Sequence, residues 1–290
     1  MRRGPGLAAT AVAVTAATAV TAVTAVGCDD GARPDLVVKG TPPATAYSGP
    51  LHVPAGRPDG SGPRALRLAS GAAGRALECD GEIFDGSGPD GWSASDGGAT
   101  PEEGLALYFD MVRPEQPDHG YRAERTEPDR VLYSYDVGGR TKVAVVVARD
   151  QQDRPGWGPE TNASCDPAEL PAGFTDTTGW EIWTDRRGRR VPVTALSSSP
   201  GSAHCGRQSA HFLTLDDRRY ARDPDGVLER DGLLRAPYRA RAGMPADAHD
   251  TGYHLRGRRL WLTDDRMTAY VRTAAGVEAW PLLKQGAGCD

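Results

Sequence analysis

The feature that most constrains the fold is a pair of glycines between two strand-like runs. Arg130–Val137 and Arg140–Arg149 are rich in β-branched and aromatic residues, and Gly138-Gly139 separates them. Glycine readily adopts the positive φ angles that both residues of a type I′ turn require. The sequence therefore predicts an antiparallel β-hairpin with a two-residue turn.

A two-residue turn determines which residues of the hairpin lie opposite each other. Counting outwards pairs Val137 with Arg140, Tyr135 with Lys142, Tyr133 with Ala144, and Val131 with Val146. Side chains alternate between the two faces of a strand. One face is then predicted to hold Val131, Tyr133, Tyr135 and Val146, and the other Leu132, Val143, Val145 and Val147. Because both faces are partly apolar, we expect them both to be covered.

Two further strands and a helix are predicted around the hairpin. Tyr121–Glu127 and Trp157–Cys165 are expected to flank it in an antiparallel meander. Thr100-Pro-Glu-Glu103 combines a capping box with proline at the first helical position, which is typical of a helix start. Apolar residues then recur at helical spacing until Pro114, namely Leu105, Tyr108, Phe109 and Val112. We expect this stripe to pack on the valine face.

The first 27 residues are predicted to be a signal peptide. Met1-Arg2-Arg3 is basic, Leu7–Val26 is an uncharged run of mostly small residues, and Cys28 follows it. This pattern favours a lipoprotein signal, in which the Cys28 thiol is lipidated and the chain is cut before it. The alternatives are an ordinary secreted protein and an uncleaved anchor. The predicted partner is therefore the membrane, and the predicted location is the outer face of the cell membrane.

The remaining cysteines predict disulfides. Cys79, Cys165, Cys205 and Cys289 are even in number, and four cysteines allow three pairings. Exported chains favour disulfides. We expect Cys79–Cys165 and Cys205–Cys289, because each pair brackets one block of predicted structure. No two cysteines form a Cys-x-x-Cys pair, so no metal site is predicted from them.

The chain is expected to have four parts. Residues 1–27 are the signal peptide, 28–72 a tether rich in Pro, Gly and Ala, 73–170 an α+β domain, and 179–290 a mostly β domain. The predicted fold class is α+β, with a helix packed on an antiparallel β meander and a mostly antiparallel β second domain. Residues 80–98 are predicted to be a glycine- and aspartate-rich loop.

The second domain is expected to be built from short strands. The predicted strands are Trp180–Asp185, Val191–Leu196, His211–Leu215, Arg218–Ala221, Arg259–Thr263, Met267–Thr273 and Val277–Leu282. Arg186–Arg190 is interpreted as a turn, and Arg241–Gly252 as a loop. The formal net charge of the whole chain is −5. Nucleic-acid-binding proteins are typically basic, so no nucleic-acid partner is predicted.

Four groups of residues are weak candidates for chemistry. Ser202 and His204 lie close in sequence without a nucleophile motif. Asp247, His249, Asp250 and His254 carry metal-ligand side chains without a recognisable spacing. Asp80, Glu82, Asp85 and Asp90 lack the pattern of a calcium loop. Of the six tryptophans, Trp92 is the candidate for an exposed, glycan-binding indole. No catalytic residue, metal ligand or cofactor is assigned.

Four short strings resemble an uncharacterised family of exported actinobacterial lipoproteins. They are Arg130-Val-Leu-Tyr133, Cys165-Asp-Pro-Ala-Glu-Leu170, Asp250-Thr-Gly-Tyr253 and Glu278-Ala-Trp-Pro281. The resemblance covers most of the chain after the tether. It implies no catalytic role, because the family has no known activity.

These observations favour a binding or scaffolding module of the cell envelope, anchored through Cys28. Its partner would be an envelope protein or a glycan. The first alternative is an exported hydrolase with a carboxylate-based site that the sequence does not identify. The second is a purely structural accessory of another envelope protein.

Overall fold

The computed structural model describes residues 1, 35–39, 45–54, 56, 60, 62–88, 92–93, 95–151 and 154–284. Antiparallel sheets dominate this part of the chain, and the helices are short. The fold is therefore mostly β with some helix, and is not clearly the α+β class that the sequence predicts. The division into two domains stays a prediction, since residues 34–290 belong to one compact unit.

The hairpin lies within a five-stranded antiparallel sheet with the order β1-β5-β4-β3-β2. Its strands are β1 (Ile83–Ser87), β2 (Arg122–Glu127), β3 (Arg130–Val137), β4 (Arg140–Gln151) and β5 (Arg154–Cys165). Gly138 and Gly139 form the turn between β3 and β4, with φ angles of 61° and 77°. The predicted hairpin and both flanking strands are confirmed. The predicted 80–98 loop is wrong at β1, which pairs with the end of β5.

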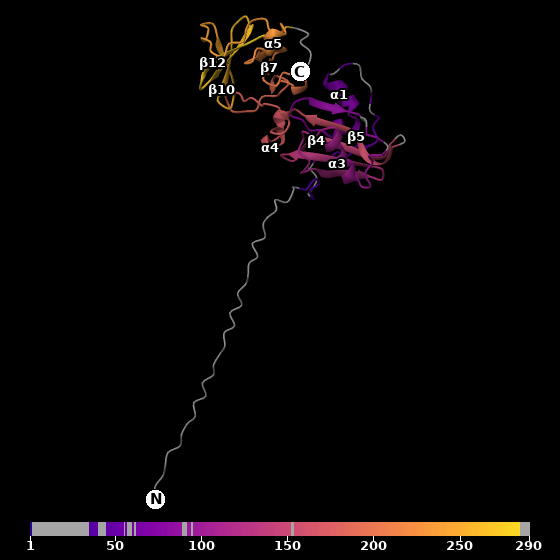
Figure 1. The fold of residues 1–290 in the computed structure, drawn as a ribbon. Helices are drawn as coiled ribbons and strands as arrows, with labels where there is room; N and C mark the ends of the chain where they lie inside the picture. The colour runs from indigo at the N-terminus through magenta and orange to yellow at the C-terminus, as the bar shows by residue number, and fades with distance from the viewer. Residues whose placement is uncertain are drawn as a thin grey trace. The chain divides into compact units, whose positions relative to one another are not determined.

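Helices cover both faces of this sheet (Figure 1). On one face lies α3 (Pro101–Met111), whose Leu105, Tyr108 and Phe109 share a core with Val143, Val145 and Val147. The other face is covered by α1 (Pro63–Ala69) and α2 (Gly71–Ala76), and α2 packs through its alanines. The expected packing of the helical stripe on the valines is confirmed.

The hairpin register departs from a simple count outwards from the turn. Val137 lies opposite Arg140 as predicted, but Asp136 pairs with Thr141 and Tyr135 with Val143. β4 therefore has one extra residue, Lys142, which is a β-bulge. The predicted pairs Tyr135–Lys142, Tyr133–Ala144 and Val131–Val146 are wrong for this reason. Beyond the bulge Tyr133 faces Val145, and Val131 faces Val147.

The bulge also regroups the two faces. Val131 and Tyr133 lie in the same core as Val143, Val145 and Val147, under α3. Leu132 lies instead with Ala144 and Val146, under α2. The predicted face assignments of the valines relative to Tyr133 and Leu132 are therefore reversed. Both faces are nevertheless apolar and covered, as predicted.

The start of α3 follows its capping signal. Thr100 is the N-cap, and its hydroxyl accepts a hydrogen bond of 3.2 Å from the Glu103 backbone amide. The Glu103 carboxylate in turn accepts 2.6 Å from the amide of Ala99. These bonds satisfy amides that an uncapped helix would leave without partners. The helix ends before Pro114, as predicted.

The prediction that residues 28–72 are a tether outside the folded domain is wrong in its described part. α1 and the first residues of α2 fall inside this range. Leu51 is 1% exposed, and Val37 forms a parallel bridge with Tyr121. The composition was misleading because α1 (Pro63–Ala69) has its proline in the first turn, where a helix tolerates it, and continues with leucine, arginine and alanine, which favour helices.

The C-terminal part holds two smaller antiparallel sheets. Their orders are β6-β7-β8 and β12-β11-β10-β9. The elements are η1 (Pro167–Glu169), α4 (Ala172–Thr175), β6 (Leu196–Pro200), η2 (Ala203–Cys205), β7 (His211–Leu215), β8 (Arg218–Arg222), α5 (Val227–Arg230), β9 (His249–Leu255), β10 (Arg258–Leu262), β11 (Thr268–Thr273) and β12 (Gly276–Pro281). Side chains from both sheets share one core around Trp183 and Trp280.

Most strands predicted in this part are confirmed, with two exceptions. The segment 180–185 forms isolated bridges at Glu181 and Thr184 rather than a strand, and 191–195 is irregular and turn structure before β6 begins at Leu196, although the turn at Arg186–Arg190 is present. The predicted loop Arg241–Gly252 is wrong at its end, where β9 begins at His249. In the described part of the chain, every helix is too short or too polar to cross a membrane.

Candidate functional site

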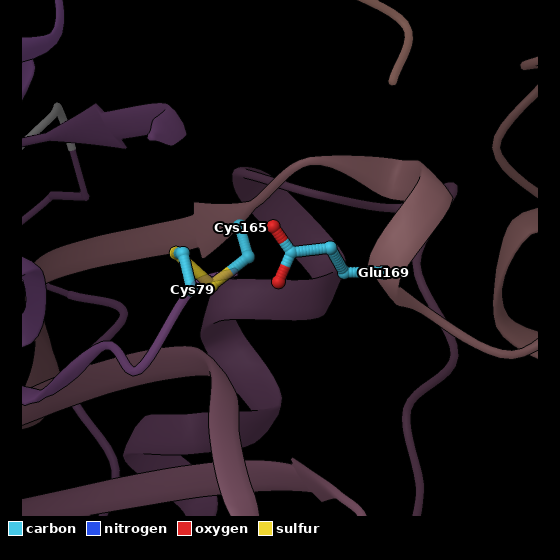
Figure 2. Close-up of side chains that lie close together, drawn as sticks. All are labelled: Cys79, Cys165 and Glu169. Atoms are coloured by element: carbon cyan, nitrogen blue, oxygen red, sulfur yellow. A yellow bond between two sulfur atoms is a disulfide. The ribbon is translucent and has the colours of Figure 1, made fainter. Parts of the chain in front are cut away.

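Three metal-ligand side chains lie close together at the end of β5. Cys79, Cys165 and Glu169 have ligand atoms within 4.8 Å of one another, the one such group in the described part of the chain (Figure 2). The two cysteines are joined in a disulfide, with 5.3 Å between their Cα atoms. A disulfide offers no thiolate to a metal. The two cysteines therefore form a covalent link beside Glu169, and the predicted Cys79–Cys165 pair is confirmed.

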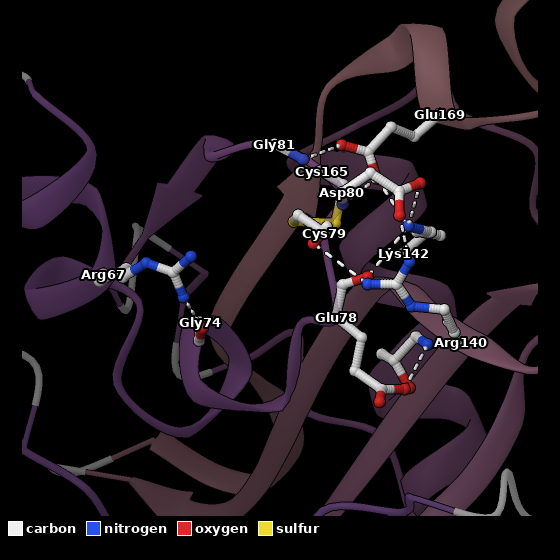
Figure 3. The surroundings of a disulfide bond; sticks show 11 residues. Arg67, Gly74, Glu78, Cys79, Asp80, Gly81, Arg140, Lys142, Cys165 and Glu169 are labelled. Atoms are coloured by element: carbon white, nitrogen blue, oxygen red, sulfur yellow. Dashed lines mark hydrogen bonds and ion pairs between the residues drawn. A yellow bond between two sulfur atoms is a disulfide. The ribbon is translucent and has the colours of Figure 1, made fainter.

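Beside the disulfide, the bulge residue Lys142 enters a polar network that is buried at Lys142 and Glu169 and reaches solvent at Asp80 and Arg140 (Figure 3). The Lys142 side chain is only 3% exposed. Its ammonium donates hydrogen bonds to the Glu169 carboxylate at 2.6 Å, the Asp80 carboxylate at 3.2 Å and the Glu78 carbonyl at 2.9 Å. All three protons of the ammonium thus have acceptors.

The Glu169 carboxylate is equally well occupied. It accepts 2.7 Å from the Asp80 amide and 3.0 Å from the Gly81 amide, in addition to Lys142. Arg140 contacts the Asp80 carboxylate and donates to the Cys79 carbonyl. Hydrogen bonds from Arg140 and Lys142 lower the pKa of Asp80. Because these donors and acceptors are paired with one another, the network is suited to holding the segment 78–81 against β4 and the residues that follow β5.

Of the other three cysteines with a predicted covalent role, Cys205 alone lies within the described residues. Cys205 is disulfide-bonded. Its predicted partner, Cys289, lies outside the described residues, and so does the predicted lipidation site Cys28. These two assignments stay predictions.

The weak candidates for chemistry are dispersed. The Ser202 hydroxyl lies 2.5 Å from His204 Nδ1, but the pair is exposed on the short η2 turn. Asp247, His249, Asp250 and His254 do not gather into a ligand group within the described residues. Asp80 and Asp85 are paired with arginines, and Asp90 lies outside the description. None of these arrangements supports a nucleophile or a metal.

Trp92 is also placed differently from the expectation. It is 2% exposed, and a Cβ added at Gly158 would lie 2.4 Å from its ring. The glycine therefore makes room for the indole, which is a core residue and not an exposed glycan platform. The partly exposed tryptophans are Trp180 and Trp261.

Trp180 belongs to a pocket of about 200 Å³ near the end of the five-stranded sheet. Its ring meets Phe84 edge to face, with 5.6 Å between the ring centroids. Phe174 and Leu170 add further apolar lining. Pockets for drug-sized molecules are larger than this, so the space suits a single ring-sized group.

Polar groups gather along one edge of the same pocket. Arg113 is paired with Asp85, and the Gln116 carbonyl accepts 3.0 Å from the Tyr108 hydroxyl. The Gln116 amide donors and the Glu115 carboxylate have no hydrogen-bond partner among the described residues, although both line the pocket. An apolar wall facing a few unsatisfied polar groups is typical of small-ligand sites.

These pocket residues were missed by the sequence analysis. Phe84 lies in the stretch interpreted as a loop, and Trp180 was assigned to a strand. They are separated by almost a hundred residues, and no local spacing connects them. Their edge-to-face contact depends on the strand pairing of β1 with β5, which the glycine-rich composition obscured.

A second polar network lies in the C-terminal part around Glu181. Its carboxylate accepts hydrogen bonds from His211 at 2.7 Å, Ser198 at 2.6 Å and Arg258 at 2.6 Å. Burial by itself raises the pKa of Glu181, but the hydrogen bonds outweigh burial and bring the pKa down to about 2. The Trp183 indole donates to Ser198 at 2.9 Å and extends the network into the core.

We expect the Glu181→Gln variant to lose about 1–2 kcal/mol of stability at pH 7, a value reduced for partial solvent screening. The folded-state pKa is lower than the ordinary value of 4.5. The carboxylate therefore contributes its full stability above about pH 4.5 and loses that contribution as the pH falls towards 2. Urea unfolding of both proteins across this range should show the difference shrinking. A difference independent of pH would contradict the assignment.

Comparison with known proteins adds no relative. No family model, no curated protein and no solved structure matches the chain.

Proposed function

We propose that the chain is a lipid-anchored binding module on the outer face of the cell membrane, and that it holds a sugar ring of an envelope glycan. The anchor would be Cys28, after the signal peptide of residues 1–27. The observation that carries the ligand proposal is the pocket of about 200 Å³ walled by Phe84 and Trp180.

The chemistry of the pocket supports a sugar rather than a purely apolar group. A pyranose ring has a C–H face that packs on aromatic side chains and a rim of hydroxyl groups. Trp180 and Phe84 offer the apolar surface, and aromatic packing contributes about 0.5–1.5 kcal/mol beyond simple burial in comparable ring contacts. Glu115 and Gln116 offer an acceptor and donors to the hydroxyl rim.

The exposed apolar side chains are scattered over the chain, which favours a small ligand over a large protein partner. The large apolar side chains exposed in the folded, described region are Val38, Leu68, Met111 and Met267. They come from separate segments of the chain. Protein-binding surfaces usually present a contiguous apolar patch, so these four residues do not favour the structural-accessory alternative.

We expect the Trp180→Ala variant to bind envelope glycan about tenfold more weakly than the wild type, equivalent to about 1.4 kcal/mol. Binding can be measured on an array of bacterial surface glycans and confirmed by titration of the bound oligosaccharide. Trp180→Phe, which retains an aromatic face, is the matched control and should lose less affinity. Thermal unfolding of each variant separates a binding defect from misfolding.

Two results would redirect this proposal. If Trp180→Ala binds glycan as the wild type does, the pocket is not the site. If the wild type releases soluble sugar from the array, the exported hydrolase is favoured, and Asp85 and Glu115 become the carboxylates to replace.

A further inference from the structure

A row of basic side chains, two of them arginines, crosses the four-stranded sheet of the C-terminal part. Arg259 on β10 lies directly opposite Arg272 on β11, and on its other side opposite His254 on β9. Residues directly opposite each other on antiparallel strands share a face, with Cβ atoms about 4.5–5.5 Å apart. Like charges in such positions repel each other. Arg259 and Arg272 thus form a cross-strand pair that is electrostatically unfavourable without an anion.

Neither arginine is neutralised by the protein. Both are exposed, and neither has a hydrogen-bond or ion-pair partner among the described residues. The other arginines near β9 and β10 differ, since Arg258 is paired with Glu181 and Arg189 with Asp185. The free pair is notable in a chain whose formal net charge is −5.

A cavity of about 370 Å³ lies beside this row, and Arg259, His254 and Arg186 are among its lining residues. The Arg186 guanidinium donates 2.8 Å to the Asp250 carbonyl, which holds its side chain across β9. Gly252 makes this position possible, because a Cβ there would lie 2.6 Å from Arg186 Nε. Arg186 is therefore placed at the cavity by the shape of the backbone.

A second cavity, of about 330 Å³, continues on the other side of Arg186. The two cavities share Arg186, Gly252 and Tyr253, and the second adds Arg187 and Arg189. The two carboxylates along this path, those of Asp250 and Asp185, each accept a hydrogen bond from the protein. Asp250 accepts from the Gly252 amide at 2.7 Å, and Asp185 accepts from Arg189 Nε at 2.8 Å. Five arginines line the two cavities against these two carboxylates, and one of the five, Arg258, is paired with Glu181, so the path as a whole carries excess positive charge.

We propose that this path binds a chain of phosphate groups, with one phosphate at Arg259 and Arg272 and the next beyond Arg186. Guanidinium groups bind phosphate through paired hydrogen bonds. A phosphate has oxygens pointing in several directions, so one group can bridge arginines on two strands, whereas a carboxylate is planar. Two adjoining cavities favour a ligand with at least two charged groups. The site is separate from the Trp180 pocket and does not depend on glycan binding there.

The test is calorimetric titration of the full chain with sodium tripolyphosphate and with orthophosphate. We expect tripolyphosphate to bind more tightly than orthophosphate and more weakly as salt is raised. The Arg259→Gln/Arg272→Gln double variant should lose at least tenfold in affinity. Arg64→Gln removes an exposed arginine without a described partner in α1, and it should bind as the wild type does.

Unfolding temperatures show whether a loss of affinity in the double variant comes from misfolding. Because the two arginines repel each other in the free protein, the double variant should unfold at the same temperature as the wild type or a higher one. Equal tripolyphosphate affinity in the wild type and the double variant would overturn the proposal. So would binding to phosphatidylglycerol vesicles without binding to tripolyphosphate, which would indicate a membrane surface, and so would tighter binding of polyglutamate, which would indicate a carboxylate polymer.

Discussion

The Lys142→Met variant is expected to unfold about 3–5 kcal/mol more easily than the wild type. Methionine retains most of the volume of the lysine stem but has no charge. The Glu169 carboxylate, whose side chain is 11% exposed, would then lose the ammonium 2.6 Å away and be left as a buried charge without a cation. Removing one partner of a buried ion pair costs more than removing both, because the remaining charge stays desolvated.

Guanidinium chloride unfolding at pH 7 measures this effect. Lys39→Met is the matched control, because Lys39 is exposed and has no described partner, so it should change stability by less than about 0.5 kcal/mol. The Lys142→Met/Glu169→Gln double variant should recover part of the loss. A loss under about 1 kcal/mol for Lys142→Met would mean that the pair is not buried in solution.

Removal of the Cys79–Cys165 disulfide is expected to have a comparable effect. The two cysteines are 86 residues apart, and closing a loop of this length lowers the entropy of the unfolded chain by an amount worth about 4–5 kcal/mol. The Cys79→Ala/Cys165→Ala double variant should therefore have a much lower denaturation midpoint than the wild type. Alanine avoids leaving a free thiol in the core, where Cys165 is fully buried.

A reductant cannot replace this variant, because Cys205 is also disulfide-bonded and would be reduced at the same time. Adding reductant to the double variant gives the separate contribution of the Cys205 bond. If the double variant unfolds within about 1 kcal/mol of the wild type, the disulfide constrains a denatured state that is already compact.

The parts of the fold that were predictable depend on local chemistry. Gly138-Gly139 determined a turn because few other residue pairs accept two positive φ angles. The capping box at Thr100 located the start of α3, and the helical spacing of its apolar residues identified the face that meets the valines. Each of these signals is complete within about a dozen residues.

The parts that were not predictable depend on contacts between distant segments. The extra residue in β4 has no local signature, since Lys142 follows a regular alternation and is stabilised by Glu169 and Asp80 far along the chain. β1 was missed because its stabilisation comes from β5. The same limit applies to the candidate site, where Phe84 and Trp180 meet only after the strands have paired.

The bulge at Lys142 separates the charge carried by β4 from the register of its valines. Deletion of this one codon would leave a regular hairpin in which Tyr135 still lies opposite Val143 and Tyr133 opposite Val145. Val143, Val145 and Val147 would then stay in the core under α3, whereas the Glu169 carboxylate would lose its cation. Deletion of Lys142 should therefore resemble Lys142→Met in its cost, and added residues at the exposed Gly138-Gly139 turn would leave both cores intact.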